Sequence, residues 1–85
     1  MTTTPEELFD LLKYNITTAS NGTTIYQLNG EVHRDEDQPA VIGVDGSKYW
    51  FQNGTRHRDN QPAVIKANGS EYWFRNGKLI KSEQS

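Results

Sequence analysis

Asp45-Gly46-Ser47-Lys48-Tyr49-Trp50-Phe51-Gln52-Asn53-Gly54 sets six residues, several of them β-forming, between an Asp-Gly and an Asn-Gly dipeptide. Such dipeptides are strong hairpin signals, because a two-residue type I′ turn needs positive φ at both central positions. The segment therefore predicts a strand with a type I′ turn at each end. The pattern occurs three times, since dipeptide glycines at 22, 46 and 69 are 24 and 23 residues apart and those at 30, 54 and 77 repeat these steps.

A second element repeats with a similar period. Pro39-Ala40-Val41-Ile42 returns 23 residues later as Pro62-Ala63-Val64-Ile65. Repeats of this length predict stacked supersecondary units. We expect a mainly β fold, an antiparallel β-meander of three hairpin repeats of about 23 residues in a single twisted sheet, capped by a short N-terminal helix. The predicted strands cover 16–20, 23–28, 31–34, 40–44, 47–52, 55–58, 63–67, 70–75 and 78–81.

The N-terminal segment differs from the repeats. Thr4-Pro5-Glu6-Glu7 supplies a helix N-cap, a proline at the first helical position and a glutamate at the third. Leucines at 8, 11 and 12 then share a face, which predicts a helix over 5–13 that caps one end of the sheet. The chain thus divides into a helical segment 1–14, repeats 15–38, 39–61 and 62–81, and a polar tail 82–85, all within one domain.

Composition narrows the class of protein. The chain has 85 residues, 33% of them apolar, and nine basic against eleven acidic side chains give a net charge of −2. This balance disfavours a polycationic nucleic-acid binder and a polyacidic mimic of DNA. Cysteine is absent, which excludes disulfides and thiolate chemistry. The N-terminus resembles neither a signal peptide nor a membrane span, so we expect a cytoplasmic protein without a membrane anchor.

Two-residue turns would place the residues at 26, 50 and 73 on one face of the sheet as an aromatic ladder, with Val41 and His57 flanking Trp50. The opposite, aliphatic face would collect Ile16, Ile25, Val32, Ala40, Ile42, Val44, Tyr49, Phe51, Ala63, Ile65, Tyr72, Phe74 and Leu79. Lys66 would sit opposite Glu71. One sheet and one short helix cannot bury two apolar faces, so we expect a homodimer or another protein partner to cover one of them.

The motif His-Arg-Asp occurs at 33–35 and at 57–59. It allows a catalytic interpretation, with imidazole as base and aspartate as its orienting group. No nucleophile recurs beside it, and a motif that recurs with each repeat favours a structural role in which arginine and aspartate fix the loop before the proline. We therefore predict no enzymatic activity. No metal-ligand spacing and no phosphate-binding glycine loop is present in the sequence, so no metal or cofactor is expected.

The pattern W-F-x-N-G-x-x-H-R-x(3–4)-P-A-V-I, carried by Trp50 to Ile65, resembles the divergent MORN-like repeats of bacteriophage and giant-virus proteins. The resemblance covers residues 20–80. It departs from a typical MORN unit in lacking glycines where Trp50, Arg58 and Trp73 stand, and in having Ile80 at the histidine position. The resemblance implies a non-enzymatic repeat scaffold that binds proteins. It also implies a viral or bacteriophage origin, with action in the host cytoplasm by occupying a host protein such as a defence component.

Aromatic, arginine and histidine side chains are the candidate partner-binding residues, since tryptophan, tyrosine and arginine contribute most of the binding energy at protein interfaces. They are Trp50, Trp73, His57, Arg56, Arg58, Arg75, Tyr26 and His33. The same groups leave a second hypothesis open, binding of a nucleotide or a single-stranded nucleic acid, although the acidic run at 35–37 would repel phosphates. A third is a structural, self-assembling repeat unit. No membrane binding is expected, because a basic surface and an amphipathic anchor are both missing.

Overall fold

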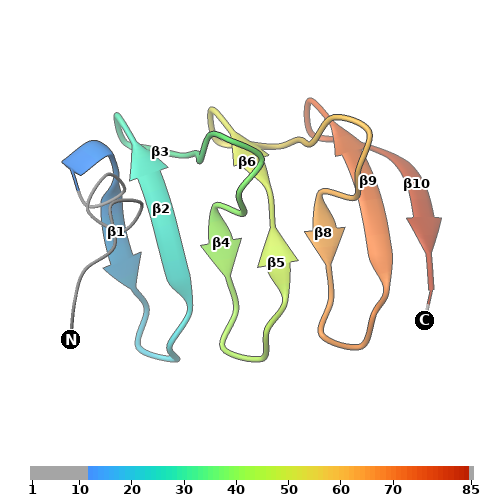
Figure 1. The fold of residues 1–85 in the computed structure, drawn as a ribbon, viewed down its shortest axis with the longest axis horizontal. Helices are drawn as coiled ribbons and strands as arrows, with labels where there is room; N and C mark the ends of the chain where they lie inside the picture. The colour runs from blue at the N-terminus through green and yellow to red at the C-terminus, as the bar shows by residue number, and fades with distance from the viewer. Residues whose placement is uncertain (1–11, 85) are drawn as a thin grey trace.

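The computed structural model describes residues 12–84, and within them the chain is mainly β and antiparallel (Figure 1). The helix predicted for 5–13 lies almost entirely outside the described residues. The strands are β1 (Asn15–Thr18), β2 (Thr24–Leu28), β3 (Glu31–Val32), β4 (Val41–Ile42), β5 (Lys48–Tyr49), β6 (Phe51–Gln52), β7 (Thr55–Arg56), β8 (Val64–Ile65), β9 (Glu71–Arg75) and β10 (Lys78–Glu83). The main sheet has the order β1-β2-β4-β5-β8-β9-β10, with β3 paired to β2.

The prediction of a single sheet is wrong, because β6 and β7 form a second, two-stranded sheet. The predicted strand over 47–52 divides at Trp50. Its N–H donates to the Ala63 carbonyl at 2.7 Å, whereas its own carbonyl accepts the His57 N–H at 3.1 Å. The chain therefore changes its pairing partner from β8 to β7 at this residue. The last strand extends to Glu83, beyond the predicted end at 81, because a bulge between Leu79 and Lys81 lets the pairing with β9 continue.

The six Asn-Gly and Asp-Gly dipeptides form two kinds of turn. At Asn53-Gly54 both residues have positive φ, 52° and 80°, as a type I′ turn requires, and the turns at 29–30 and 76–77 match it. At Asp45-Gly46 only the glycine has positive φ, and the Asp45 carboxylate accepts the Ser47 N–H at 2.9 Å. The turns at 21–22 and 68–69 are built in the same way. The prediction of type I′ geometry is therefore wrong for these three turns.

The corrected turns move the register by one residue. Tyr49 pairs with Val41 and with Val64, whereas the sequence predicted that Trp50 would face Val41. Lys66 bonds through its N–H to Ser70 and not to Glu71, whose partner is Ile65. In these turns the Asn or Asp side chain accepts the backbone N–H of the residue after the glycine, and the loop is one residue longer than a two-residue turn. The extra residue shifts the pairing by one, so the residues before the turn point to the opposite face of the sheet from the one predicted.

Two rows of side chains cross the sheet on opposite faces. Ala40 and Ala63, both 0% exposed, lie in the row Tyr26–Ala40–Trp50–Ala63–Trp73, which we call the alanine–aromatic row. The prediction that these alanines share a face with Tyr49 is therefore wrong. Alternation of small and large side chains leaves room for each ring beside its neighbours. The other face carries the row Ile25–Val41–Tyr49–Val64–Tyr72.

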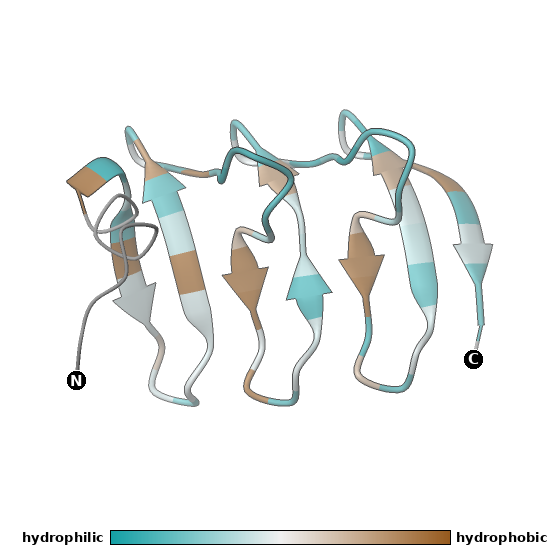
Figure 2. Cartoon of the chain, viewed as in Figure 1, coloured by the Kyte–Doolittle hydropathy of each residue, from teal (hydrophilic) through white to brown (hydrophobic). Residues whose placement is uncertain are grey.

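The core of this thin sheet is small. Among residues 12–84 the buried apolar residues are Tyr14, Ala40, Trp50, Ala63 and Val64. Figure 2 shows β4 and β8, which lie between the aromatic-bearing strands β2, β5 and β9, in the apolar colour throughout. The molecule is elongated, with extents of 38 × 24 × 23 Å, and β1 and β10 form opposite edges of the main sheet (Figure 1). Within residues 12–84, no helix is long and apolar enough to cross a membrane.

Candidate functional site

A cation covers each large ring of the alanine–aromatic row, always eight residues further along the chain. The guanidinium of Arg34 lies 3.8 Å from the centre of the Tyr26 ring, and that of Arg58 lies 3.9 Å from the Trp50 ring. Lys81 places its ammonium 4.7 Å from the Trp73 ring. Cations at these distances are attracted by the ring quadrupole. The rings are therefore held between a cation and the sheet.

Arg58 also ties two loops together. Its Nε and Nη2 atoms donate to the Asp37 carboxylate at 2.7 and 3.1 Å, and its Nη1 donates to the Pro62 carbonyl at 3.1 Å. The Trp50 indole N–H donates to the backbone carbonyl of Asp37 at 3.0 Å. Together these contacts leave Trp50 only 6% exposed. Arg34 makes the equivalent bond to the Pro39 carbonyl, so both arginines fix the loop before a proline, as expected from the sequence.

The two histidines make matching pairs of bonds. Nδ1 of His57 accepts the backbone N–H of Asn76, and Nδ1 of His33 accepts that of Asn53, both at 3.0 Å. A backbone N–H can only donate, so Nδ1 carries no proton and, in the neutral ring, the proton resides on Nε2. Nε2 of His33 then donates to Asp35 at 2.7 Å, and Nε2 of His57 donates to Asp59 at 3.0 Å. Each histidine thereby links its own loop to the next Asn-Gly turn.

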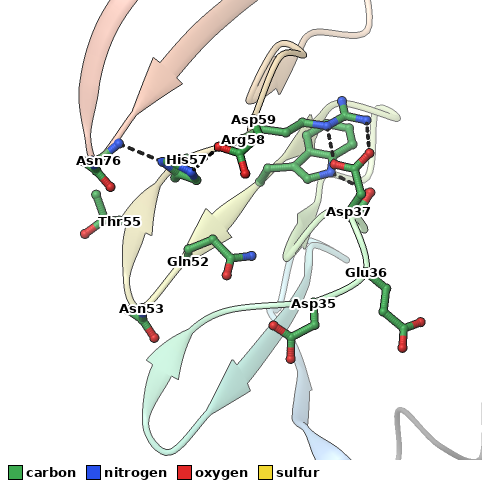
Figure 3. A pocket seen from close by; sticks show the side chains of 11 residues that line it. Asp35, Glu36, Asp37, Gln52, Asn53, Thr55, His57, Arg58, Asp59 and Asn76 are labelled. Carbon is green, nitrogen blue, oxygen red and sulfur yellow. Dashed lines mark hydrogen bonds and ion pairs between the residues drawn. The ribbon is translucent and has the colours of Figure 1, made fainter.

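Beside these contacts lies a cavity of about 640 Å³ (Figure 3). It is lined by Asp35, Glu36, Asp37, Trp50, Gln52, Asn53, Thr55, His57, Arg58, Asp59 and Asn76. Four of the lining residues carry carboxylates and one carries a guanidinium, which already bonds to Asp37. The cavity, which we call the acidic cleft, is therefore negatively charged and rich in hydrogen-bond acceptors.

Ion pairing lowers the pKa of two of these carboxylates. The hydrogen bond from Arg58 lowers the pKa of Asp37 below its ordinary value of 3.8. Hydrogen bonds from Lys13 and then from His33 lower the pKa of Asp35 in the same way. Both side chains therefore carry full negative charge at neutral pH.

The opposite face holds a different arrangement. The exposed guanidinium of Arg56 lies 5.7 Å from the Tyr49 ring centre, 5.9 Å from that of Phe51 and 5.3 Å from that of Phe74. These rings and Tyr72 are half-buried. We call this surface the Arg56 face. It combines a cation with several aromatic rings on rigid strands.

The structure separates the predicted partner-binding residues into groups. Trp50, His57 and Arg58 come together at the acidic cleft. Tyr26 and His33 lie by β2 and β3, and Trp73 lies on β9 beneath Lys81. Arg56 is on the other face, and Arg75 is exposed at the end of β9, opposite Lys78.

Two sets of candidate residues escaped sequence reasoning. One is the group of carboxylates around the cleft, Asp35, Glu36, Asp37 and Asp59. The other is the set of rings around Arg56, which the sequence pattern placed on the aliphatic face and not among the binding residues. In each repeat a cation follows the aromatic residue by eight positions, at 26/34, 50/58 and 73/81. This constant spacing in the sequence indicates that a cation covers the Trp50 ring.

Among residues 12–84, no group of three or more histidine, cysteine or acidic side chains is arranged to hold a metal ion. No protein-family model matches this chain, and comparisons with curated proteins and with solved structures gave no significant match.

Proposed function

We propose that this chain is a non-enzymatic protein-binding module built from three MORN-like repeat units. The sequence periods of 24 and 23 residues support the repeat organisation, as does the recurrence of the same turn, the same histidine bonds and the same cation over a ring. The resemblance to bacteriophage and giant-virus repeats supports a viral origin and a host protein in the cytoplasm as the partner.

The observation that carries the proposal is the Arg56 face. Aromatic residues and arginine are the side chains that contribute most of the binding energy at protein interfaces. Here Tyr49, Phe51 and Phe74 surround an exposed guanidinium, and the rings are half-buried. Strand pairing fixes the backbone that carries these side chains, so little backbone ordering is needed when a partner covers them.

The cleft residues support the same function indirectly. Arg58, His33 and His57 link loops to neighbouring turns across about twenty residues of sequence. These bonds hold the strands that carry the Arg56 face in a fixed arrangement. A preorganised surface binds with a lower ordering cost than a flexible one.

Nucleotide or single-stranded nucleic-acid binding has less support. Base stacking needs an accessible ring face. The Trp50 ring is covered by Arg58, and the cleft beside it is lined by four carboxylates, which repel phosphate.

The test compares two variants that make the same charge change on opposite faces. Arg56→Glu alters the Arg56 face, whereas Lys48→Glu alters an exposed residue of the other face. Immobilised protein captures partners from a lysate of candidate host cells, and the captured protein is then purified and titrated. We expect Arg56→Glu to weaken binding at least about tenfold, and Lys48→Glu to leave it unchanged, with both variants retaining the wild-type circular dichroism spectrum.

An equal loss of binding by both variants, or no loss by Arg56→Glu, would exclude the Arg56 face as the contact surface. Binding lost on Arg75→Ala or Trp73→Phe but kept by Arg56→Glu would instead assign contact to the residues predicted from the sequence on the other face.

A further inference from the structure

Strand β10 forms one edge of the main sheet, and its six residues are all exposed. Leu79 is 52% and Ile80 is 55% exposed. An edge strand presents unpaired backbone N–H and C=O groups, and one this long is a ready template for another strand. Its outward-facing backbone groups are therefore available to an extended segment.

The charges along this edge are arranged with opposite signs at its two ends. Lys78 lies directly across from Arg75 of β9, whereas Glu83 lies directly across from Glu71. Like charges facing each other across two strands are unfavourable. One end of the edge is therefore positive and the other negative, and each end lacks a counter-charge directly opposite on β9.

The bulge between Leu79 and Lys81 decides which face these charges share. Because Ile80 is the extra residue, Lys78, Lys81 and Glu83 all point to the face that also carries Arg75, Trp73 and Glu71. Glu83 has one ion pair within its own strand, to Lys81 at 3.3 Å, and both side chains are more than half exposed. Such an exposed pair is weak and leaves Glu83 available to another cation.

We propose that β10 pairs antiparallel with β10 of a second copy of this chain across a two-fold axis, which joins two sheets into one. With the axis between residues 80 and 81, Lys78 lies opposite Glu83 of the partner subunit, and the reciprocal pair forms at the other end. Each like-charge pair then gains a counter-charge on the same face. A parallel arrangement would set like charges against like.

The opposite edge of the sheet is less suited to this pairing. Strand β1 is Asn-Ile-Thr-Thr, which contains no charged side chain to fix a register. The proposed dimer goes beyond the protein-binding function and does not depend on it, because it uses the edge of the sheet and leaves the Arg56 face open.

The test uses charge reversal and a dilution series followed by sedimentation velocity. Lys78→Glu places a glutamate opposite Glu83 of the partner subunit at both ends, and Glu83→Lys does the converse. Each single variant should weaken dimerisation by about tenfold or more. Each also removes a like-charge pair within the monomer. Because Glu83→Lys breaks the exposed Lys81–Glu83 ion pair as well, circular dichroism must show that each variant keeps the wild-type fold.

Mixing the two single variants provides the decisive result. In a heterodimer of Lys78→Glu with Glu83→Lys, both charge pairs are again complementary, so dimer should reappear on mixing, and the double variant should dimerise like the wild type. Lys48→Glu, away from the edge, should change nothing. A wild-type chain that stays monomeric at every concentration, or single variants that dimerise normally, or a mixture that stays monomeric, would overturn the proposal.

Arg56→Glu separates this dimer from the proposed function. We expect it to leave the dimer intact while it weakens partner binding. Dimerisation lost with Arg56→Glu and kept with Lys78→Glu would show that the copies meet through the Arg56 face and not through β10.

Discussion

The two histidines show how one side chain can join a turn to a separate loop. An imidazole ring accepts on one nitrogen and donates on the other, on opposite sides of a rigid ring. At His33 this geometry joins the N–H of Asn53 to the carboxylate of Asp35. Asparagine or glutamine offers both functions from a single amide and cannot span the same gap. The His-Arg-Asp motif is thus explained by linkage between neighbouring units, and its match to catalytic motifs is incidental.

Removing these rings should therefore destabilise the fold to different degrees. His33 is 8% exposed, whereas His57 is only half-buried. A backbone N–H left without an acceptor costs about 1–3 kcal/mol when buried and less when water reaches it. We expect His33→Ala to lower the free energy of unfolding by about 2 kcal/mol and His57→Ala by less, measured by chemical denaturation. Arg75→Ala, at an exposed position, should stay within about 0.5 kcal/mol of the wild type. An equal loss at both histidines would contradict the dependence on burial, and no loss at either would contradict the linkage.

The Asp37–Arg58 pair should make stability depend on pH in acid. The pKa of Asp37 is lowered in the folded chain, chiefly by the hydrogen bond from Arg58. Its contribution is therefore fully present above the ordinary, unfolded-state pKa of 3.8 and is lost as the pH falls through the lower folded-state pKa. Melting temperatures of the wild type and Asp37→Asn should differ at pH 6 and converge toward pH 2. A difference that persists unchanged into strong acid would show that the carboxylate charge contributes nothing.

At the scale of strands and turns, the sequence predicts where the elements lie better than how they pair. All nine predicted strand segments contain observed strands, because β-forming runs and Asn-Gly or Asp-Gly dipeptides are local signals. These local signals do not determine the pairing register. Asn53 adopts positive φ, whereas Asn68, which also precedes a glycine, keeps negative φ and accepts the Ser70 N–H through its side chain. Both conformations are open to the same dipeptide, and tertiary contacts choose between them.

The observed register places the alanines beside the tryptophans, so enlarging an alanine should disturb the packing between neighbouring strands. Ala63 is fully buried between Trp50 and Trp73. Ala63→Val adds two methyl groups where no space remains, so it should lower the free energy of unfolding by about 1–3 kcal/mol and shift the tryptophan fluorescence. Ala19 is exposed in the turn between β1 and β2, so Ala19→Val is the matched control and should have little effect. In the register predicted from sequence, Ala63 would not touch either indole, and Ala63→Val would leave the fluorescence unchanged.

On the scale of the whole molecule, the same register explains why the candidate site was only partly predictable. Local patterns name Trp50, His57 and Arg58 among eight candidate binding residues, and the structure brings these three together at the acidic cleft. They do not reveal that Arg58 covers Trp50, nor that Arg56 lies among three rings on the other face. Those relations depend on which neighbour each strand pairs with, and a shift of one residue exchanges the faces.

A one-layer sheet with its core in the middle should also have graded local stability. The amides of Trp50 and Ala63 bond across central strands next to fully buried side chains, whereas β10 is an exposed edge. Local opening requires the least free energy where few apolar contacts must break. Among the hydrogen-bonded strand amides, native-state hydrogen exchange should therefore be slowest at Trp50 and Ala63 and fastest in β10 at low protein concentration. Protection of β10 alone should then rise with concentration as the edge becomes paired, and the Lys78→Glu variant should abolish this rise. Uniform protection at all concentrations would mean that the chain opens only as a whole and that its edge stays unpaired.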